Sequence, residues 1–230
     1  MCFEMNKPSN TCYMCDAPET GREHVPPKCL FPEEKDLPNG IDLRKNLFKV
    51  PSCDAHNSQK SHDDEYFLYA LSGNYLINEV GRNLYRTKVR RAIGRNSSLL
   101  GKIASTATTV SFKDPISGNA VNSVGFELDA NRFNTIVDRL GRAIYFYHFK
   151  EKWKYGIKYQ AEFLSATVNQ SDEENLPLKE ITNQADEWFS NVAYYGQNPA
   201  VFKYQAIEAE KSQRMRLHFY EGCKLLLIFE

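Results

Sequence analysis

Two pairs of potential metal ligands near the start of the chain constrain its fold more than any other feature. Cys12 and Cys15 are separated by two residues, and the pair Cys53 and His56 repeats that spacing. A two-residue spacer lets a tight turn present both side chains to one ion, and two such pairs complete a closed tetrahedral site of the kind that structural zinc occupies. We therefore predict that these four residues bind a structural Zn²⁺.

Coordination would replace a hydrophobic core in this part of the chain. Residues 11–60 are rich in Cys, His and Pro and have little regular periodicity, so they cannot bury enough apolar surface to fold by packing alone. The first ten residues lack the apolar run of a secretory signal, so we expect a cytoplasmic protein with reduced thiols. Cys29 lies between the two pairs and is a rival ligand, but it has no partner at ligand spacing.

Charge and hydropathy limit the partners that the chain as a whole could attract. Its 230 residues balance 29 basic against 29 acidic side chains, so no global field favours nucleic acid or a membrane surface. The longest apolar run, Leu225–Phe229, is far too short to span a bilayer, and we expect no membrane partner. Electrostatic binding must therefore come from local clusters of charge.

One such cluster follows the ligand-rich stretch. From Arg82 to Lys102 every charged side chain is basic, and arginines at 82, 86 and 90 recur every fourth residue, which places them on one face of a helix. We predict a helical region over residues 74–100 that contacts phosphates, with an ordinary solvated helix face as the alternative. The residues assigned to nucleic-acid binding are Lys60, Arg82, Arg86, Arg90, Arg91 and Arg95.

Hydrophobic periodicity divides the rest of the chain into helices and strands. A helix is predicted from Asn57 to Ser72, ending at Gly73, and its early acidic residues suit the helix dipole. His148 and His218 lie in apolar contexts, so we expect them to be structural. Further along we predict a β-hairpin over 103–125, a helix over 130–147, a strand over 153–164, a polar loop over 169–178, a helix over 178–189, and strands over 201–208 and 215–229.

Further features are linked in order to the two ligand pairs. An acidic residue precedes a histidine at Glu23-His24, and Val-Pro-Pro follows; an Asn-Leu pair begins a strand pattern at Asn46. The second ligand pair runs directly into Asn57, with Lys60 three residues later. This arrangement over residues 12–65 resembles the HNH endonuclease family, whose core is the ββα-metal fold. The resemblance implies metal-dependent hydrolysis of phosphodiester bonds, in DNA or alternatively in RNA.

The resemblance assigns roles position by position. His24 matches the histidine that acts as general base, and Glu23 matches the acidic residue that helps bind the catalytic divalent ion. Asn46 matches the asparagine that holds the loop and helps orient the histidine. Asn57 matches the last signature position, a metal ligand. The structural zinc positions match Cys12, Cys15, Cys53 and His56.

Two positions depart from the family pattern. The last zinc position is usually cysteine in zinc-bearing members, and here it is His56, which still permits tetrahedral binding. Ser61 stands where some members have a further histidine ligand. The catalytic ion would then have few protein ligands and several waters, which favours Mg²⁺ or Mn²⁺.

Together these patterns predict an α+β protein with three parts. A small zinc-stapled ββα-metal (HNH) module would cover residues 1–72, a basic helical segment residues 73–104, and a mixed, mainly antiparallel α+β domain residues 105–230. We expect the last part to recognise substrate, a protein partner or a second copy in a homodimer. The resemblance implies a setting in bacterial or phage defence or in a mobile element. The alternative is a non-catalytic zinc-stabilised module that binds nucleic acid or protein.

Overall fold

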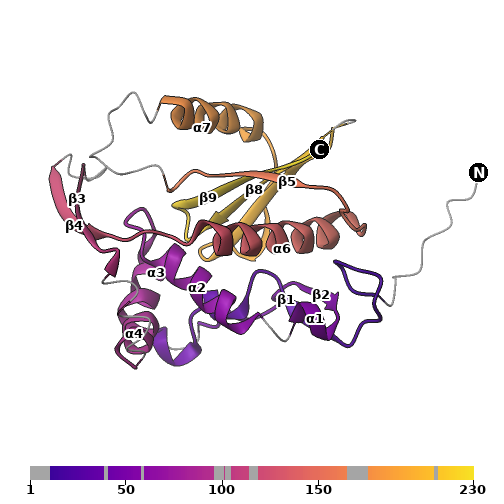
Figure 1. Ribbon diagram of the computed structural model, residues 1–230, viewed down its shortest axis with the longest axis horizontal. Coiled ribbons are helices and arrows are strands. Elements are labelled where there is room, and N and C mark those ends of the chain that lie inside the picture. Colours follow the sequence, from indigo (N-terminus) through magenta and orange to yellow (C-terminus); the bar gives the residue numbers. More distant parts are fainter. Residues whose placement is uncertain are drawn as a thin grey trace, which may run out of the picture.

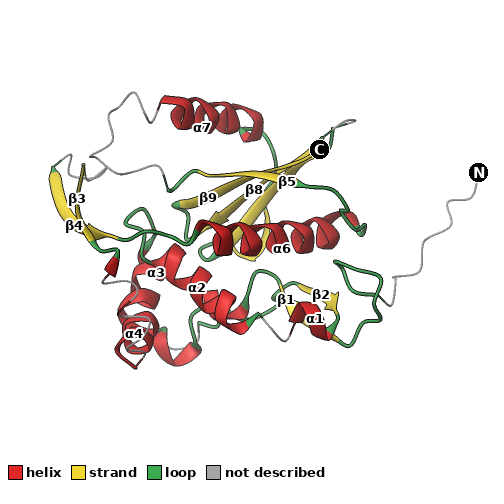
Figure 2. Cartoon of the chain, in the orientation of Figure 1, coloured by secondary structure: helices red, strands yellow, loops and turns green. Residues whose placement is uncertain are grey.

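The computed structural model describes residues 11–38, 41–57, 60–95, 101, 105–113, 119–164, 176–209 and 212–230. Within these residues the chain forms two two-stranded sheets, one five-stranded sheet and several helices (Figures 1 and 2). All strand pairs named below are antiparallel, which confirms the predicted α+β class. No helix in the described part of the chain has both the length and the apolar character needed to cross a bilayer.

The ligand-rich stretch forms a strand pair followed by two helices. β1 (Gly21–His24) pairs with β2 (Lys49–Ser52), and the connection between them contains the short 3₁₀ helices η1 (Lys28–Leu30) and η2 (Glu34–Asp36). Two helices follow β2, namely α1 (Asp54–Asn57) and α2 (Ser61–Ser72). The single helix predicted from Asn57 is therefore wrong at its start, because Asn57 ends α1 and α2 begins at Ser61.

The basic segment is helical but not uniform. α3 (Glu79–Leu84) is capped by Asn78, whose side chain accepts a hydrogen bond from the Gly81 N–H at 3.1 Å. The π-helical turn η3 (Tyr85–Val89) and then α4 (Arg90–Arg95) follow directly. Arg82 in α3 and Arg86 in η3 both pair with Glu79, so these two arginines share one face of the helical segment. Residues 96–100 of the predicted helix lie outside the described residues.

The later elements largely follow the predicted pattern. β3 (Thr108–Lys113) pairs with β4 (Ala120–Gly125), which confirms the hairpin. α6 (Ala130–Phe149) is capped by Asp129, whose side chain accepts a hydrogen bond from the Arg132 N–H at 3.0 Å. The strand predicted over 153–164 is shorter, β5 (Ile157–Ala161). Most of the loop predicted over 169–178 lies outside the described residues, and its last three positions are already in α7 (Leu176–Phe189).

The five-stranded sheet has the order β5-β9-β8-β7-β6. β6 (Tyr195–Asn198) was not predicted, and β7 (Phe202–Ile207) matches the strand predicted over 201–208. The strand stretch predicted over 215–229 is two strands, β8 (Gln213–Phe219) and β9 (Cys223–Phe229). They separate at Tyr220 and Glu221, whose φ angles of 46° and 63° turn the chain back on itself.

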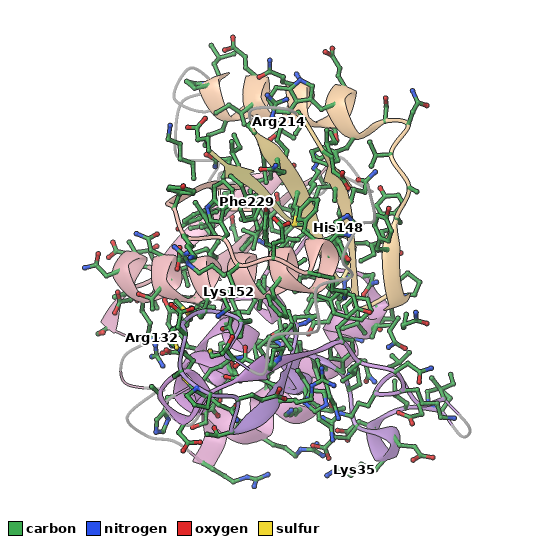
Figure 3. The ribbon with its side chains drawn as sticks, turned by 90° about the vertical axis from the view of Figure 1, so that its right-hand side faces the viewer. Lys35, Arg132, His148, Lys152, Arg214 and Phe229 are labelled. Carbon is green, nitrogen blue, oxygen red and sulfur yellow. The ribbon has the colours of Figure 1, made fainter. Side chains whose placement is uncertain are left out.

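The sheet lies between two helices, with α6 on one face and α7 on the other (Figures 1 and 3). In Figure 3, Phe229 lies toward α6, in the main hydrophobic core, and Arg214 lies toward α7, 4.0 Å from the centre of the Trp188 ring. The main core also receives α2, because Phe67 packs edge-on against Phe219 with ring centres 5.5 Å apart. A single core therefore extends from the ligand-rich stretch to the sheet.

Candidate functional site

The two predicted ligand pairs meet in one cluster, formed by Cys12, Cys15, Cys53 and His56 and called the Cys/His cluster below. Its ligand atoms all lie within 4.8 Å of one another. The first pair flanks a turn closed by a hydrogen bond from the Cys12 N–H to the Ala17 carbonyl at 2.9 Å. The second pair joins the end of β2 to α1, so the hairpin and the helix converge on the same point.

The distances within the Cys/His cluster fit one tetrahedral ion. Zinc bonds of about 2.3 Å to sulfur and about 2.0 Å to nitrogen place two sulfurs about 3.8 Å apart and a sulfur and a nitrogen about 3.5 Å apart. The Cys15 and Cys53 sulfurs are 3.7 Å apart, and the His56 Nδ1 atom lies 3.2–3.5 Å from the three sulfurs. A disulfide would require about 2.05 Å. The four residues could therefore hold a metal ion.

Local hydrogen bonds favour the thiolate form of one ligand. Burial opposes ionisation of Cys53, but the backbone N–H of His56 and the neighbouring thiols of the Cys/His cluster outweigh it, so the pKa of Cys53 is lowered. A thiolate is the form that binds metal. The rival ligand Cys29 lies elsewhere, with its thiol 3.3 Å from the Asp64 carbonyl, and burial raises its pKa to about 12. Cys29 is thus a neutral, partly buried thiol outside the Cys/His cluster.

A second site lies beside the end of β1, between α2 and α6. Glu23 and His24 line this pocket together with Lys60, Asp64 and Arg139, and it is called the Glu23–His24 pocket below. Its cavity volume of about 20 Å³ is room for a water molecule. The sequence alone left open how adjacent strand residues, which normally face opposite ways, could serve one site. Both Glu23 and His24 line this pocket, and His24 is the last residue of its strand.

Glu23 is already paired with a cation inside the protein. Its carboxylate, whose side chain is 4 % exposed, accepts hydrogen bonds from Lys60 Nζ at 3.1 Å and from the Ser52 hydroxyl at 3.4 Å. The same ammonium lies 3.8 Å from Asp64 Oδ1. Burial raises the pKa of Asp64 to about 6, while Lys60 acts against that rise. Lys60, predicted to contact phosphate, thus lies between two carboxylates.

His24 has the electrostatics of a proton acceptor. Its side chain is partly buried, and burial lowers its pKa; the nearby ammonium groups of Lys49, Lys28 and Lys60 lower it further. The imidazole is therefore neutral at physiological pH, and a neutral imidazole can take a proton from water.

The two asparagines of the predicted site do not line the Glu23–His24 pocket. Asn46 is exposed, has a φ of 54° and borders a different hollow beside Phe48 and Asn198. Asn57 is exposed at the end of α1, and its amide nitrogen lies 3.8 Å from the point that a Cβ on Gly21 would occupy. Because Gly21 and Glu23 are two residues apart, Asn57 lies on the same face of β1 as Glu23 but nearer the start of the strand.

Two residues of the Glu23–His24 pocket were missed by sequence reasoning. Asp64 was interpreted only as a helix-dipole charge in the first turn of α2, and it now faces Lys60. Arg139 comes from α6 and pairs with Asp63 at 3.2 Å. No sequence pattern links α6 to β1, because tertiary packing alone brings residues of both to this pocket.

The arginines of the basic segment fall into two groups. Arg82 and Arg86 both pair with Glu79, at 3.5 and 2.8 Å, and Arg91 pairs with Asp36 at 3.0 Å. Arg90 and Arg95 are exposed, and the structure shows no ion pair for either within the described part of the chain. Exposed ion pairs contribute about 1 kcal/mol or less, so phosphates could compete for the paired arginines as well.

Comparison of the chain with family models, with curated proteins and with solved structures found no match. Its function must therefore be argued from the Cys/His cluster, the Glu23–His24 pocket and the charges around them.

The histidine pair predicted to be structural leads to a test of stability against pH. His148 Nδ1 lies 3.2 Å from the Tyr204 hydroxyl. The pKa of His218 is lowered to about 3, first by burial and then by the cations Arg216, Lys224 and Lys203. Asp186 opposes this shift more weakly. A histidine in an unfolded chain has a pKa of about 6.5, so below that pH the unfolded chain binds a proton that the folded chain does not.

We therefore expect His218 to make folding less favourable as the pH falls, by about 3 kcal/mol between about pH 7 and pH 4. Urea denaturation at a series of pH values measures this loss. The variant His218→Gln has no titrating group at this position and should lose correspondingly less stability over the same range. An identical pH slope in the two proteins would contradict the assignment.

Proposed function

We propose that the chain is a metal-dependent endonuclease of the HNH type that hydrolyses phosphodiester bonds of DNA. One observation carries the proposal: Glu23 and His24 converge on one pocket at the end of a strand pair that leads, through the Cys/His cluster, into a helix. This strand–strand–helix order is the one that the sequence resemblance implies. The Cys/His cluster would hold structural Zn²⁺, which suits its three sulfurs and one nitrogen.

In this proposal His24 is the general base. Its neutral imidazole would accept the proton of the attacking water, since the side chain lines the pocket in which that water would sit. A Mg²⁺ or Mn²⁺ ion, when bound, would neutralise charge on the scissile phosphate. Glu23 and Asp64 would hold that ion, because their oxygens already surround one cation, the Lys60 ammonium.

Once a divalent ion has displaced the Lys60 ammonium from the two carboxylates, Lys60 would be free to contact the substrate. Its ammonium could then bind a phosphate oxygen of the substrate, while Asn57 would need a small shift of α1 to reach the same ion from its place beside Gly21. Arg90 and Arg95, exposed on α4, would contact the DNA backbone. The five-stranded sheet with its helices would recognise the substrate, a protein partner or a second copy of the chain.

A non-catalytic binding module is the second candidate, and one specific observation favours it. Lys60 Nζ lies 3.1 Å from Glu23, where it neutralises the carboxylate that a divalent ion would need. A permanent ion pair here would stabilise the fold and leave no metal site. The zinc-stabilised module would then bind nucleic acid or protein through the basic segment without cutting it.

Plasmid nicking by His24→Ala separates the two candidates. Purified protein is incubated with supercoiled plasmid and Mg²⁺ or Mn²⁺, and we expect nicking by the native protein and a loss of roughly 10²–10⁴-fold in the variant, the usual contribution of a general base. His62→Ala is a matched control, because His62 is exposed at the start of α2 outside the pocket. Nicking by His24→Ala at the native rate would refute the proposal. Plasmid binding without nicking by any of the proteins would favour the binding module.

A further inference from the structure

The sheet face that α7 covers carries a second and larger pocket, called the α7-side pocket below. It lies at the C-terminal end of α7, where Phe189 and Ser190 form one wall and side chains from β7, β8 and β9 form another. Its cavity volume of about 330 Å³ falls in the range that small organic ligands occupy. The Glu23–His24 pocket lies beside α6, so the sheet separates the two (Figure 1).

Three basic side chains cross the α7-side pocket in a single row. The strand register places Lys203 of β7 opposite His218 of β8, and His218 opposite Lys224 of β9. All three line the pocket, and neighbouring strands are about 4.8 Å apart. His218 is neutral, so the two lysines are the charged members of the row, with a histidine hydrogen-bonding group between them. An anion bound across the row would interact favourably with both lysines at once.

The protein's own carboxylates only partly compensate for the row. Asp186 Oδ1 is 2.6 Å from the Arg216 guanidinium and 3.6 Å from Lys224 Nζ, so its charge is shared. Glu221 also lines the pocket, from the turn between β8 and β9. Lys203 Nζ lies 4.4 Å from the centre of the Tyr194 ring, and within the described residues the structure shows no carboxylate partner for it.

His218, in the middle of the row, has a ring nitrogen without a hydrogen-bond partner among the described residues. The residue is 4 % exposed, and its Nε2 atom is buried with no hydrogen-bond partner among the described residues. Its ring lies edge-on to Tyr194, with ring centres 5.3 Å apart. A buried polar atom without a partner costs free energy that a ligand oxygen would recover.

We propose that the α7-side pocket binds a small phosphomonoester. Its phosphate oxygens would accept hydrogen bonds from Lys203, His218 Nε2 and Lys224, and its organic part would lie along the half-exposed Tyr194 ring. A phosphate has enough terminal oxygens for three donors in a row, whereas a carboxylate has two. The volume leaves room for more than the phosphate group. This binding is independent of the proposed nuclease activity.

Calorimetric titration of the full chain with adenosine monophosphate and with inorganic phosphate tests the proposal. We expect saturable binding of the nucleotide at one site per chain and none of adenosine, which lacks the phosphate. Lys203→Met and His218→Gln should each weaken binding about tenfold or more, as expected for the loss of one hydrogen bond to a charged group. Lys154→Met, an exposed lysine outside the pocket, and His24→Ala should bind like the native protein.

Lys203→Met keeps the test meaningful if His218→Gln fails to fold, because Lys203 is only partly buried. A second measurement follows the ¹⁵N signals of the His218 ring, which should shift when the nucleotide is added. Absence of saturable binding by the folded native protein, or equal affinity in Lys203→Met and Lys154→Met, would overturn the proposal. If inorganic phosphate binds but adenosine monophosphate does not, the claim that the ligand carries an organic group would be refuted.

Discussion

The variant Cys53→Ser should lose the zinc proposed for the Cys/His cluster and most of its stability. Cys53 is one of the four residues of the Cys/His cluster, which brings together the turn at Cys12–Cys15, the end of β2 and α1. Structural zinc contributes about 10–16 kcal/mol of binding free energy in small zinc domains, comparable with the entire stability of a typical protein of about 5–15 kcal/mol. Metal analysis and thermal unfolding of the purified variant measure the two losses.

Cys29→Ser is the matched control for this experiment. Its thiol is partly buried and lies against the Asp64 carbonyl, outside the Cys/His cluster, so the variant should keep about one zinc per chain. The proposed activity should fall with the zinc as well, since Ser52, the residue before Cys53, hydrogen bonds to Glu23. A folded Cys53→Ser protein with full zinc content, or a folded native protein without zinc, would contradict the assignment.

The variant Phe67→Ala should destabilise the whole chain, not only its first part. Phe67 of α2 is fully buried and packs against Phe133 of α6 and Phe219 of β8, with ring centres 5.9 and 5.5 Å away. Truncation of a buried phenylalanine costs about 3–5 kcal/mol. Because the three rings belong to elements far apart in sequence, we expect one cooperative transition at a lower urea concentration.

Tyr155→Ala provides the comparison, since this ring is 68 % exposed and its loss should change stability by about 0.5 kcal/mol or less. Circular dichroism reports on all helices and strands, and tryptophan fluorescence reports on Trp153 and Trp188, on opposite sides of the sheet. Separate transitions by the two probes, with only one of them shifted in Phe67→Ala, would show that the ligand-rich stretch unfolds by itself.

The features that sequence predicted best depend on short-range spacing. The Cys/His cluster follows from two pairs with the same two-residue spacer, and tetrahedral coordination leaves little freedom in how such pairs combine. The helix predicted over 130–147 is α6, because apolar residues at helical spacing cover one side of it and Asp129 caps its start. The hairpin of β3 and β4 likewise shows in β-branched runs on either side of a turn sequence.

The features that sequence did not predict depend on distant partners. The position of Lys60 between Glu23 and Asp64 follows from how α2 packs beside β1, which no local pattern encodes. The row of Lys203, His218 and Lys224 exists only through the register of three strands. β6 is short, irregularly paired and contains Gly196 with a φ of 142°, so it has no clear strand pattern.

The position of β9 in the sheet determines when this fold can be completed during synthesis. β9 follows all the other strands in the sequence, yet it lies inside the sheet, between β5 and β8. Until residues 223–229 leave the ribosome, β5 has no partner and β8 presents an open edge, and such edges invite pairing with other chains. The Cys/His cluster needs only residues 12–56, so the nascent chain could bind a metal ion there long before its sheet closes. Its greatest risk of aggregation therefore falls between the synthesis of β5 and that of β9, after the residues of the Cys/His cluster have emerged.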